Sequence, residues 1–143
     1  SRSHSGALIV RNDEIVSTGY NGAPRGRSNC IDLGYCIRER LGIPAGERYE
    51  LCRSVHAEMN AIISAARSEC IGGTIYLAGR DVATGELIPD LLPCPMCRRM
   101  IINAGLSKIV IRRTPSTYDI LNVQDWVFHD DSVIDPSESG EQA

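Results

Sequence analysis

The sequence predicts an α/β fold in which helices cover a sheet whose second half is parallel. One observation is the order of apolar segments, which runs strand, strand, helix, strand, helix, strand along the chain. The other is the length of 143 residues, which favours one domain because two pieces would be too small to bury good cores. We assign residues 1–129 to this domain and expect residues 130–143, which are acidic and rich in Ser, to be a disordered tail.

The first two strands are predicted to form an antiparallel hairpin. Residues 6–10 and 15–20 read as short strands, and the polar residues 11–14 between them read as a turn. Residues 21–53 show no sustained periodicity and contain seven glycines and prolines. A connection this long is uncommon in a compact domain unless it is functional or held by a metal.

The first helix is expected to begin after Ser54, a good N-cap residue, and to run to about Arg67. Apolar residues recur there at helical spacing and predict one buried face. These residues are Val55, Met59, Ile62, Ile63 and Ala66. Gly72 and Gly73 then break the chain, and residues 74–78 read as a strand.

The second helix is the best defined element. Pro95 suits the first helical position and Gly105 suits the C-terminal cap, which predicts a helix from Pro95 to about Ala104. Before it, residues 79–93 read as a loop with a turn at Thr84 and Gly85. After it, residues 108–112 read as a strand, whereas residues 114–129 do not favour either helix or strand.

The charge and composition exclude several classes of protein. The chain has a formal net charge of -3. Without the five acidic residues of the tail, 13 acidic residues stand against 15 basic ones, and this excess is too small to indicate nucleic-acid binding. No run approaches the 18 apolar residues that a membrane span needs. No basic segment followed by an apolar one marks a secretory signal in this sequence, and a Cys-x-x-Cys pair favours a reduced compartment, so we expect a cytoplasmic protein.

The strongest functional signal combines His56-Ala57-Glu58 with Cys94-Pro95-Met96-Cys97. One His and two Cys residues supply three zinc ligands, and three protein ligands with a fourth position open to water are typical of catalytic zinc. Both motifs lie at predicted helix starts, where the helix dipole favours thiolates. Glu58 is then placed to move protons between the bound water and a substrate, as in the zinc deaminases that serve as the general model for this signature.

Each motif alone has a simpler explanation. A Cys-x-x-Cys pair is also found as a redox pair or as half of a structural zinc site. A single His at a helix start more often caps the helix or packs against it. The two motifs together, in this order and each opening a helix, favour catalytic zinc.

Four segments resemble the cytidine and deoxycytidylate deaminase superfamily, with closer likeness to the deoxycytidylate (dCMP) deaminases. They are Gly19-Tyr-Asn-Gly-Ala-Pro-Arg-Gly26, His56-Ala-Glu-Met-Asn-Ala-Ile62, Pro93-Cys-Pro-Met-Cys97 and Met100-Ile-Ile-Asn-Ala-Gly105. The resemblance implies a three-layer α/β/α fold around a mixed sheet of about five strands. It also implies zinc ligation by His56, Cys94 and Cys97, with Glu58 as the proton shuttle.

The same resemblance implies an activity and partners. Zinc-bound hydroxide would attack C4 of the cytosine ring and convert dCMP to dUMP and ammonia. Asn21 matches a residue that contacts the sugar, and Ala57 is assigned to the substrate as well. Family members commonly form homo-oligomers, often hexamers, and many are activated by dCTP and inhibited by dTTP. No membrane partner is expected.

The sequence departs from the family pattern in three places. The family has a helix before the first strand, but only five residues of this sequence precede Gly6, and loss of that helix would remove one layer and an assembly surface. The loop 79–92 is longer than usual and would lie near the pocket mouth. Cys30, Cys36 and Cys52 resemble the ligands of a second, structural zinc, with buried free thiols as the alternative.

Other functions stay open on the sequence. A deaminase of tRNA adenosine, guanine or a riboflavin precursor would share the zinc motifs. A non-catalytic module stabilised by zinc is the alternative from another class, although a purely structural site would close its fourth position and has no need of Glu58.

Overall fold

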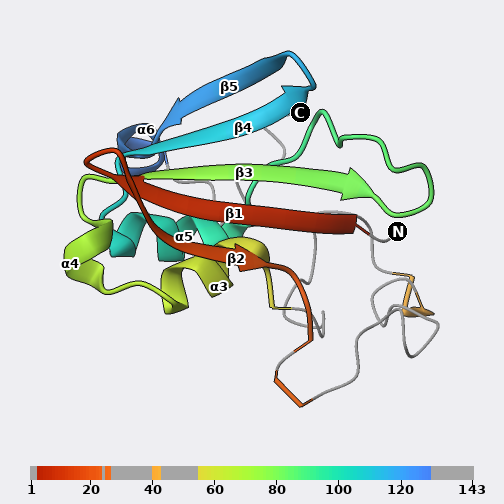
Figure 1. Ribbon diagram of the computed structural model, residues 1–143, viewed down its shortest axis with the longest axis horizontal. Coiled ribbons are helices and arrows are strands. Elements are labelled where there is room, and N and C mark those ends of the chain that lie inside the picture. The colour runs from red at the N-terminus through yellow and green to blue at the C-terminus, as the bar shows by residue number, and fades with distance from the viewer. Residues whose placement is uncertain (1–2, 24, 27–39, 43–54, 130–143) are drawn as a thin grey trace, which may run out of the picture.

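The computed structural model describes residues 3–23, 25–26, 40–42 and 55–129, and its elements carry the labels of Figure 1. The five strands are β1 Ser3–Arg11, β2 Glu14–Tyr20, β3 Thr74–Asp81, β4 Lys108–Thr114 and β5 Thr117–Asn122. The helices of the described part are α3 Ala57–Ile63, α4 Arg67–Cys70, α5 Pro95–Ala104 and α6 Val123–Phe128.

The strands form one mixed sheet in the order β2-β1-β3-β4-β5 (Figure 1). The pairs β1–β2, β1–β3 and β4–β5 are antiparallel, whereas β3 and β4 are parallel, as their separation by α5 requires. The α/β class and the sheet of five strands are therefore confirmed, and so is the parallel pairing in the second half of the chain.

One face of the sheet forms the core. Side chains alternate along a strand, so Ile9, Ile75, Leu77, Ile109 and Ile111 all point to the same face and are buried. Helices α3, α4, α5 and α6 contribute the other side of this core through Ala61, Cys70, Ile101 and Val123, among others. Full burial of each Ile side chain stabilises the fold by about 1.5–3 kcal/mol.

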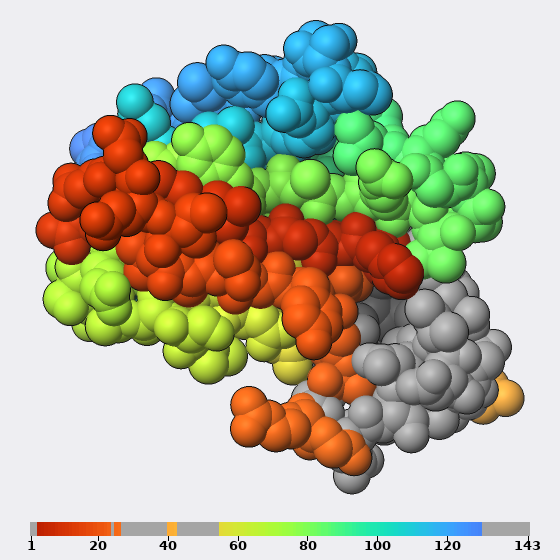
Figure 2. Space-filling view, viewed as in Figure 1, coloured from red at the N-terminus to blue at the C-terminus, as the bar shows by residue number. Residues whose placement is uncertain are grey.

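The opposite face carries a row of apolar side chains that no described helix covers. Leu8, Tyr76, Val110 and Ile120 are successive partners across β1, β3, β4 and β5. Tyr76 is 41% exposed and Ile120 is 54% exposed. Figure 1 shows the helices gathered on one side of the sheet, and Figure 2 shows atoms of β1, β3, β4 and β5 at the surface. Among the described residues no helix lies on this face, so the second helical layer of the expected α/β/α fold is not part of the described structure.

The first predicted helix is wrong in its length and in its buried face. The helix α3 ends at Ile63, and α4 begins separately at Arg67 after Ala66 adopts an extended conformation. The buried side chains of α3 are Ala57, Glu58 and Ala61, whereas Ile63 is 70% exposed. The reason is the close approach of α3 to β2, where only small side chains fit. The expected cap Ser54 lies outside the described residues.

The second half of the chain follows the prediction more closely. The helix α5 has the predicted bounds, and its cap Gly105 adopts the left-handed conformation with φ of 83°. The ambiguous residues 114–129 form β5 and α6, with Trp126 packed against the core. No described helix has the length and apolar character that a membrane span requires. The tail 130–143 and the cysteines proposed for a second zinc, Cys30, Cys36 and Cys52, lie outside the described residues.

Candidate metal centre

Three predicted metal ligands come together at the starts of two helices. His56 directly precedes α3, Cys94 is the N-cap residue of α5, and Cys97 lies in the first turn of α5. Their ligand atoms all lie within 4.8 Å of one another. The imidazole Nδ1 of His56 is 3.3 Å from Sγ of Cys97 and 3.4 Å from Sγ of Cys94.

This donor set fits a tetrahedral zinc ion. Bonds of about 2.0 Å to nitrogen and 2.3 Å to sulfur place the two ligand atoms about 3.5 Å apart in tetrahedral geometry. The separations in the structure are close to that value. One imidazole and two sulfurs are a ligand set that zinc accepts, and no fourth protein donor joins them among the described residues.

The local sequence explains why the sulfurs sit where they do. Pro95 begins the helix, and the backbone N–H of Cys97 donates a hydrogen bond to Sγ of Cys94 over 3.4 Å. The Nε of Arg98 donates to the carbonyl oxygen of Pro93 over 3.0 Å, and Pro93 is fully buried. The residues on both sides of Cys94 are therefore held in place.

In the absence of metal, the pKa values of the two cysteines are shifted in opposite directions from their ordinary value. A hydrogen bond from the Cys97 thiol stabilises the Cys94 thiolate and lowers the pKa of Cys94 to about 4. The same hydrogen bond, together with burial, raises the pKa of Cys97 above its ordinary value. The raised pKa of Cys97 favours its thiol, and a metal that binds both sulfurs as thiolates displaces that proton.

Glu58 is buried directly beside these ligands, where it is 6% exposed. Burial raises the pKa of Glu58 above its ordinary value of 4.5, although hydrogen bonds and the charge of His56 act in the opposite direction. The Glu58 carboxyl also forms a side-chain hydrogen bond with Cys97. A carboxyl group of raised pKa next to a metal site is suited to accept and return protons near neutral pH.

Asn21 is brought close to this centre by the backbone. Gly22 and Val55 exchange two backbone hydrogen bonds of 3.1 and 2.6 Å, so the chain after β2 runs alongside the residue that precedes His56. The Oδ1 atom of Asn21 accepts from the N–H of Ser5, and its Nδ2 donates to the carbonyl oxygen of Ser3. A contact with a sugar would have to use the hydrogen-bonding capacity that these two bonds leave on the Asn21 amide. That sugar contact stays a prediction.

Ala57 is fully buried at the start of α3. Its carbonyl oxygen lies against Gly19 of β2, at a distance that leaves no room for a side chain on that strand. The substrate contact assigned to Ala57 also stays a prediction. The position of Ala57 instead identifies it as the point where α3 rests on the sheet.

Sequence reasoning missed three polar residues that hold the centre in place. Ser17 Oγ donates to the carbonyl oxygen of Ala61 over 2.7 Å, and Asn60 Nδ2 donates to the carbonyl oxygen of Tyr20 over 2.7 Å. Both bonds tie α3 to β2. The third residue, Arg113, holds the loop before Cys94. None of these pairings has a signal in the local sequence, because the partners lie 22 to 44 residues apart.

Comparison with known proteins gives consistent results. The model of the cytidine and deoxycytidylate deaminase zinc-binding region matches residues 1–113. A deoxycytidylate deaminase of Mycobacterium phage D29 is 34% identical over 114 residues, which cover 76% of this chain and 77% of that protein. A deoxycytidylate deaminase of Schizosaccharomyces pombe is 33% identical over 105 residues, or 73% of this chain, and the match spans only 29% of that longer protein.

Solved structures support the fold alone. The cytidine deaminase of Burkholderia pseudomallei aligns with a TM-score of 0.53 at 20% identity, covering 87% of this chain and 78% of that one. The match of the family model to most of the chain, on a fold that places the His/Cys/Cys set together, leads to one conclusion. This chain belongs to the family of zinc-dependent cytidine and deoxycytidylate deaminases.

Proposed function

We propose that this chain catalyses the hydrolytic deamination of a cytosine nucleotide, with dCMP converted to dUMP and ammonia. The family membership and the relatives named deoxycytidylate deaminase support this substrate class. The observation that carries the proposal is the buried carboxyl of Glu58 next to a set of three ligands formed by His56, Cys94 and Cys97.

Zinc, when bound, supplies a Lewis acid that lowers the pKa of a coordinated water to about 7. The role of Glu58 follows from its burial and its raised pKa. Its carboxylate accepts the proton of the water that forms the new bond to C4 of the cytosine ring. Glu58 then gives this proton to N3 and carries the second proton of the water to the amino group. The C4–N bond breaks, and ammonia and the uracil product leave.

A non-catalytic zinc module explains the site less well. Burying a carboxyl costs free energy because the charged form loses its hydration. A purely structural site has no use for that group and normally closes its fourth position with another side chain. A catalytic role therefore explains the burial of the Glu58 carboxyl better than a purely structural role does.

A substrate panel tests the proposal. Ammonia release is measured with dCMP, dCTP, deoxycytidine, CMP and guanine, each with and without added dCTP as an effector. We expect dCMP to be the best substrate. Release from guanine alone would move the chain to another branch of the superfamily, and no release from any compound would favour the module.

A matched pair of variants tests the role of Glu58. Glu58→Gln should keep zinc and lose at least about 10³-fold in turnover, since the proton shuttle is removed while the shape is kept. Glu69→Gln, the same chemical change at an exposed site in α4, should leave turnover unchanged. Turnover of Glu58→Gln within a few-fold of the parent would show that Glu58 is not the proton shuttle.

Assembly and regulation are part of the same proposal. The relation to deoxycytidylate deaminases leads us to expect a homo-oligomer, with a hexamer as the first candidate, and regulation by dCTP and dTTP. Light scattering on the full chain and the dCTP arm of the substrate panel measure both properties.

A further inference from the structure

The loop between β3 and α5 is held in two different ways along its length. Its first part continues the sheet, because Asp81 N–H donates to Glu86 O and Ile88 N–H donates to Gly79 O, both over 2.9 Å. The Asp81 carboxylate accepts from the N–H groups of Ala83 and Thr84 and closes the turn. After Ile88 the loop leaves the sheet and leads directly to the metal ligand Cys94.

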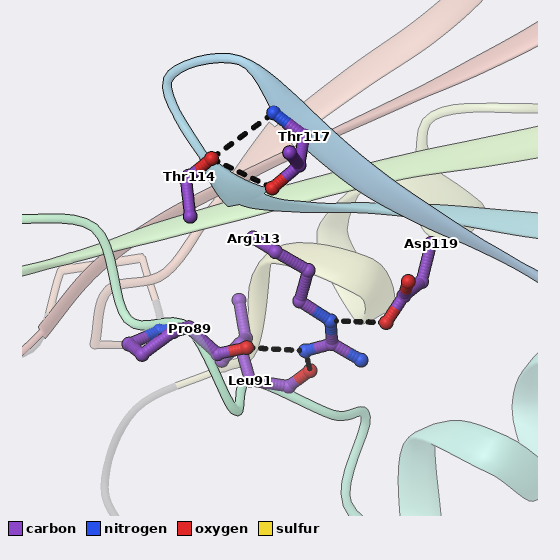
Figure 3. A network of polar contacts seen from close by, with 6 residues as sticks. All are labelled: Pro89, Leu91, Arg113, Thr114, Thr117 and Asp119. Atoms are coloured by element: carbon purple, nitrogen blue, oxygen red, sulfur yellow. Dashed lines mark hydrogen bonds and ion pairs between the residues drawn. The ribbon is translucent and has the colours of Figure 1, made fainter.

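Arg113 holds this second part (Figure 3). It lies at the end of β4, two residues beyond the buried Ile111, and its side chain is 17% exposed. Its Nη1 donates to the carbonyl oxygen of Pro89 over 3.0 Å and to that of Leu91 over 2.6 Å. Its Nε donates to Oδ2 of Asp119, on the neighbouring strand β5, over 2.8 Å.

A second arginine binds the carbonyl oxygen of Pro93, two residues beyond Leu91. The Nε of Arg98, in α5, donates to Pro93 O, and its guanidinium lies 5.6 Å from the centre of the Trp126 ring. The carbonyl oxygens of residues 89 and 91 are therefore bound from β4, and that of residue 93 is bound from α5. The backbone that enters Cys94 is held by the sheet on one side and by its own helix on the other.

We propose that Arg113 is a positioning residue for the metal centre. It sets the path of residues 89–93 so that Sγ of Cys94 reaches the ligand position beside His56 and Cys97. Asp119 orients the guanidinium and balances its charge. The planar guanidinium of Arg suits this task because its donors point in fixed directions toward several acceptors at once. This inference rests on the proposal that the site binds zinc.

The effect on metal affinity follows from the place of Arg113 in the structure. Residues that support metal ligands from outside typically change metal affinity by about 10–100-fold when they are replaced. Leu91 lies three residues before Cys94 and packs against the core, and Pro93 is fully buried, whereas Leu92 between them is 49% exposed. The Arg113 bonds therefore fix the backbone on the side of this turn that faces away from α5. Loss of the Arg113 contacts should allow Cys94 to occupy several positions in the metal-free protein.

The experiment compares zinc affinity in four proteins by competition with a chromogenic chelator, without substrate. Arg113→Ala should bind zinc about 10–100-fold more weakly than the parent. Arg112→Ala is the matched control, because Arg112 is next to it on β4 and its guanidinium donates to Pro115 O on the exposed surface, away from the loop before Cys94. The control should stay within about 3-fold of the parent. Arg113→Lys keeps the charge with fewer directed donors and should recover part of the affinity.

Two further measurements separate positioning from general stability. Thermal unfolding of the metal-free proteins shows whether Arg113→Ala is folded, and the ligand-field absorption of the Co²⁺ forms reports the geometry of the sulfur ligands. Folded Arg113→Ala with parental zinc affinity and an unchanged Co²⁺ spectrum would overturn the inference. If Arg113→Ala does not fold, the affinity of Arg113→Lys decides, and parental affinity in that variant has the same consequence. A parent that binds zinc but deaminates nothing would refute the proposed function and leave this inference standing.

Discussion

Gly19 in β2 gives the sharpest test of how the sheet positions the metal centre. A Cβ atom at Gly19 would lie 2.4 Å from the carbonyl oxygen of Ala57, 2.4 Å from the N of Ala61 and 2.9 Å from the carbonyl carbon of Asn60. All three are backbone atoms of α3 and cannot rotate away. Gly19→Ala therefore forces α3 and β2 apart.

The size of the effect follows from these contacts. Ordinary contact begins at 3.4 Å, so the two shortest distances fall short by 1.0 Å and α3 must move by about that amount. Inserting a methylene into a well-packed core typically costs about 1–3 kcal/mol, and backbone contacts place this site at the upper end. A domain of this length loses about 4 °C in Tm for each kcal/mol, so we expect a drop of about 10 °C. Because α3 carries Glu58 and follows His56, a 1 Å displacement should also lower turnover by about 10²-fold.

The assay is thermal unfolding and ammonia release for the parent, Gly19→Ala and Gly6→Ala. Gly6 lies on the neighbouring strand β1, and a Cβ atom there meets nothing within 4 Å. Gly6→Ala should be neutral or slightly stabilising, because it restricts only the unfolded chain. A Gly19→Ala protein with parental Tm and parental turnover would refute the close packing of α3 on β2.

Four further outcomes follow from the buried groups. Because burial raises the pKa of Glu58 above 4.5, its neutral form favours folding at low pH and this contribution is lost as pH rises through the raised value. Metal-free Glu58→Gln should therefore gain stability relative to the parent as pH rises above 4.5, as urea unfolding across the pH range will show. Zinc binding should release a proton from Cys97, since its pKa is raised in the metal-free site, and calorimetry in buffers of different ionisation enthalpy measures it. Chelation should abolish turnover and expose Cys94 to alkylation at neutral pH, because its pKa is about 4. Ile101→Ala should cost about 2–5 kcal/mol in the free energy of unfolding, since Ile101, on α5, is fully buried in the core.

Local signals in the sequence were sufficient for the elements that carry the cysteines. The ring of Pro95 restricts φ to a value that suits the first turn of a helix, and Gly105 readily adopts the left-handed conformation that ends one. These two residues therefore define both ends of α5 without reference to tertiary packing. Short apolar runs bounded by turn residues were enough to place β1, β3 and β4. The combination of His56 with Cys94 and Cys97 was enough to predict a zinc site, because so few residue types bind zinc. The role of Glu58 as proton carrier stays a prediction.

Only the tertiary structure decided how the metal centre is held. The apolar pattern of the first helix pointed to Ile63, but the close approach of Gly19 selected the face with Ala57 and Ala61. Arg113 and Leu91 are 22 residues apart, and no local pattern pairs a charged strand residue with a loop carbonyl. Periodicity and capping depend on neighbours within a few residues, whereas these contacts depend on which strand lies beside which loop. These contacts form only when the whole sheet has formed.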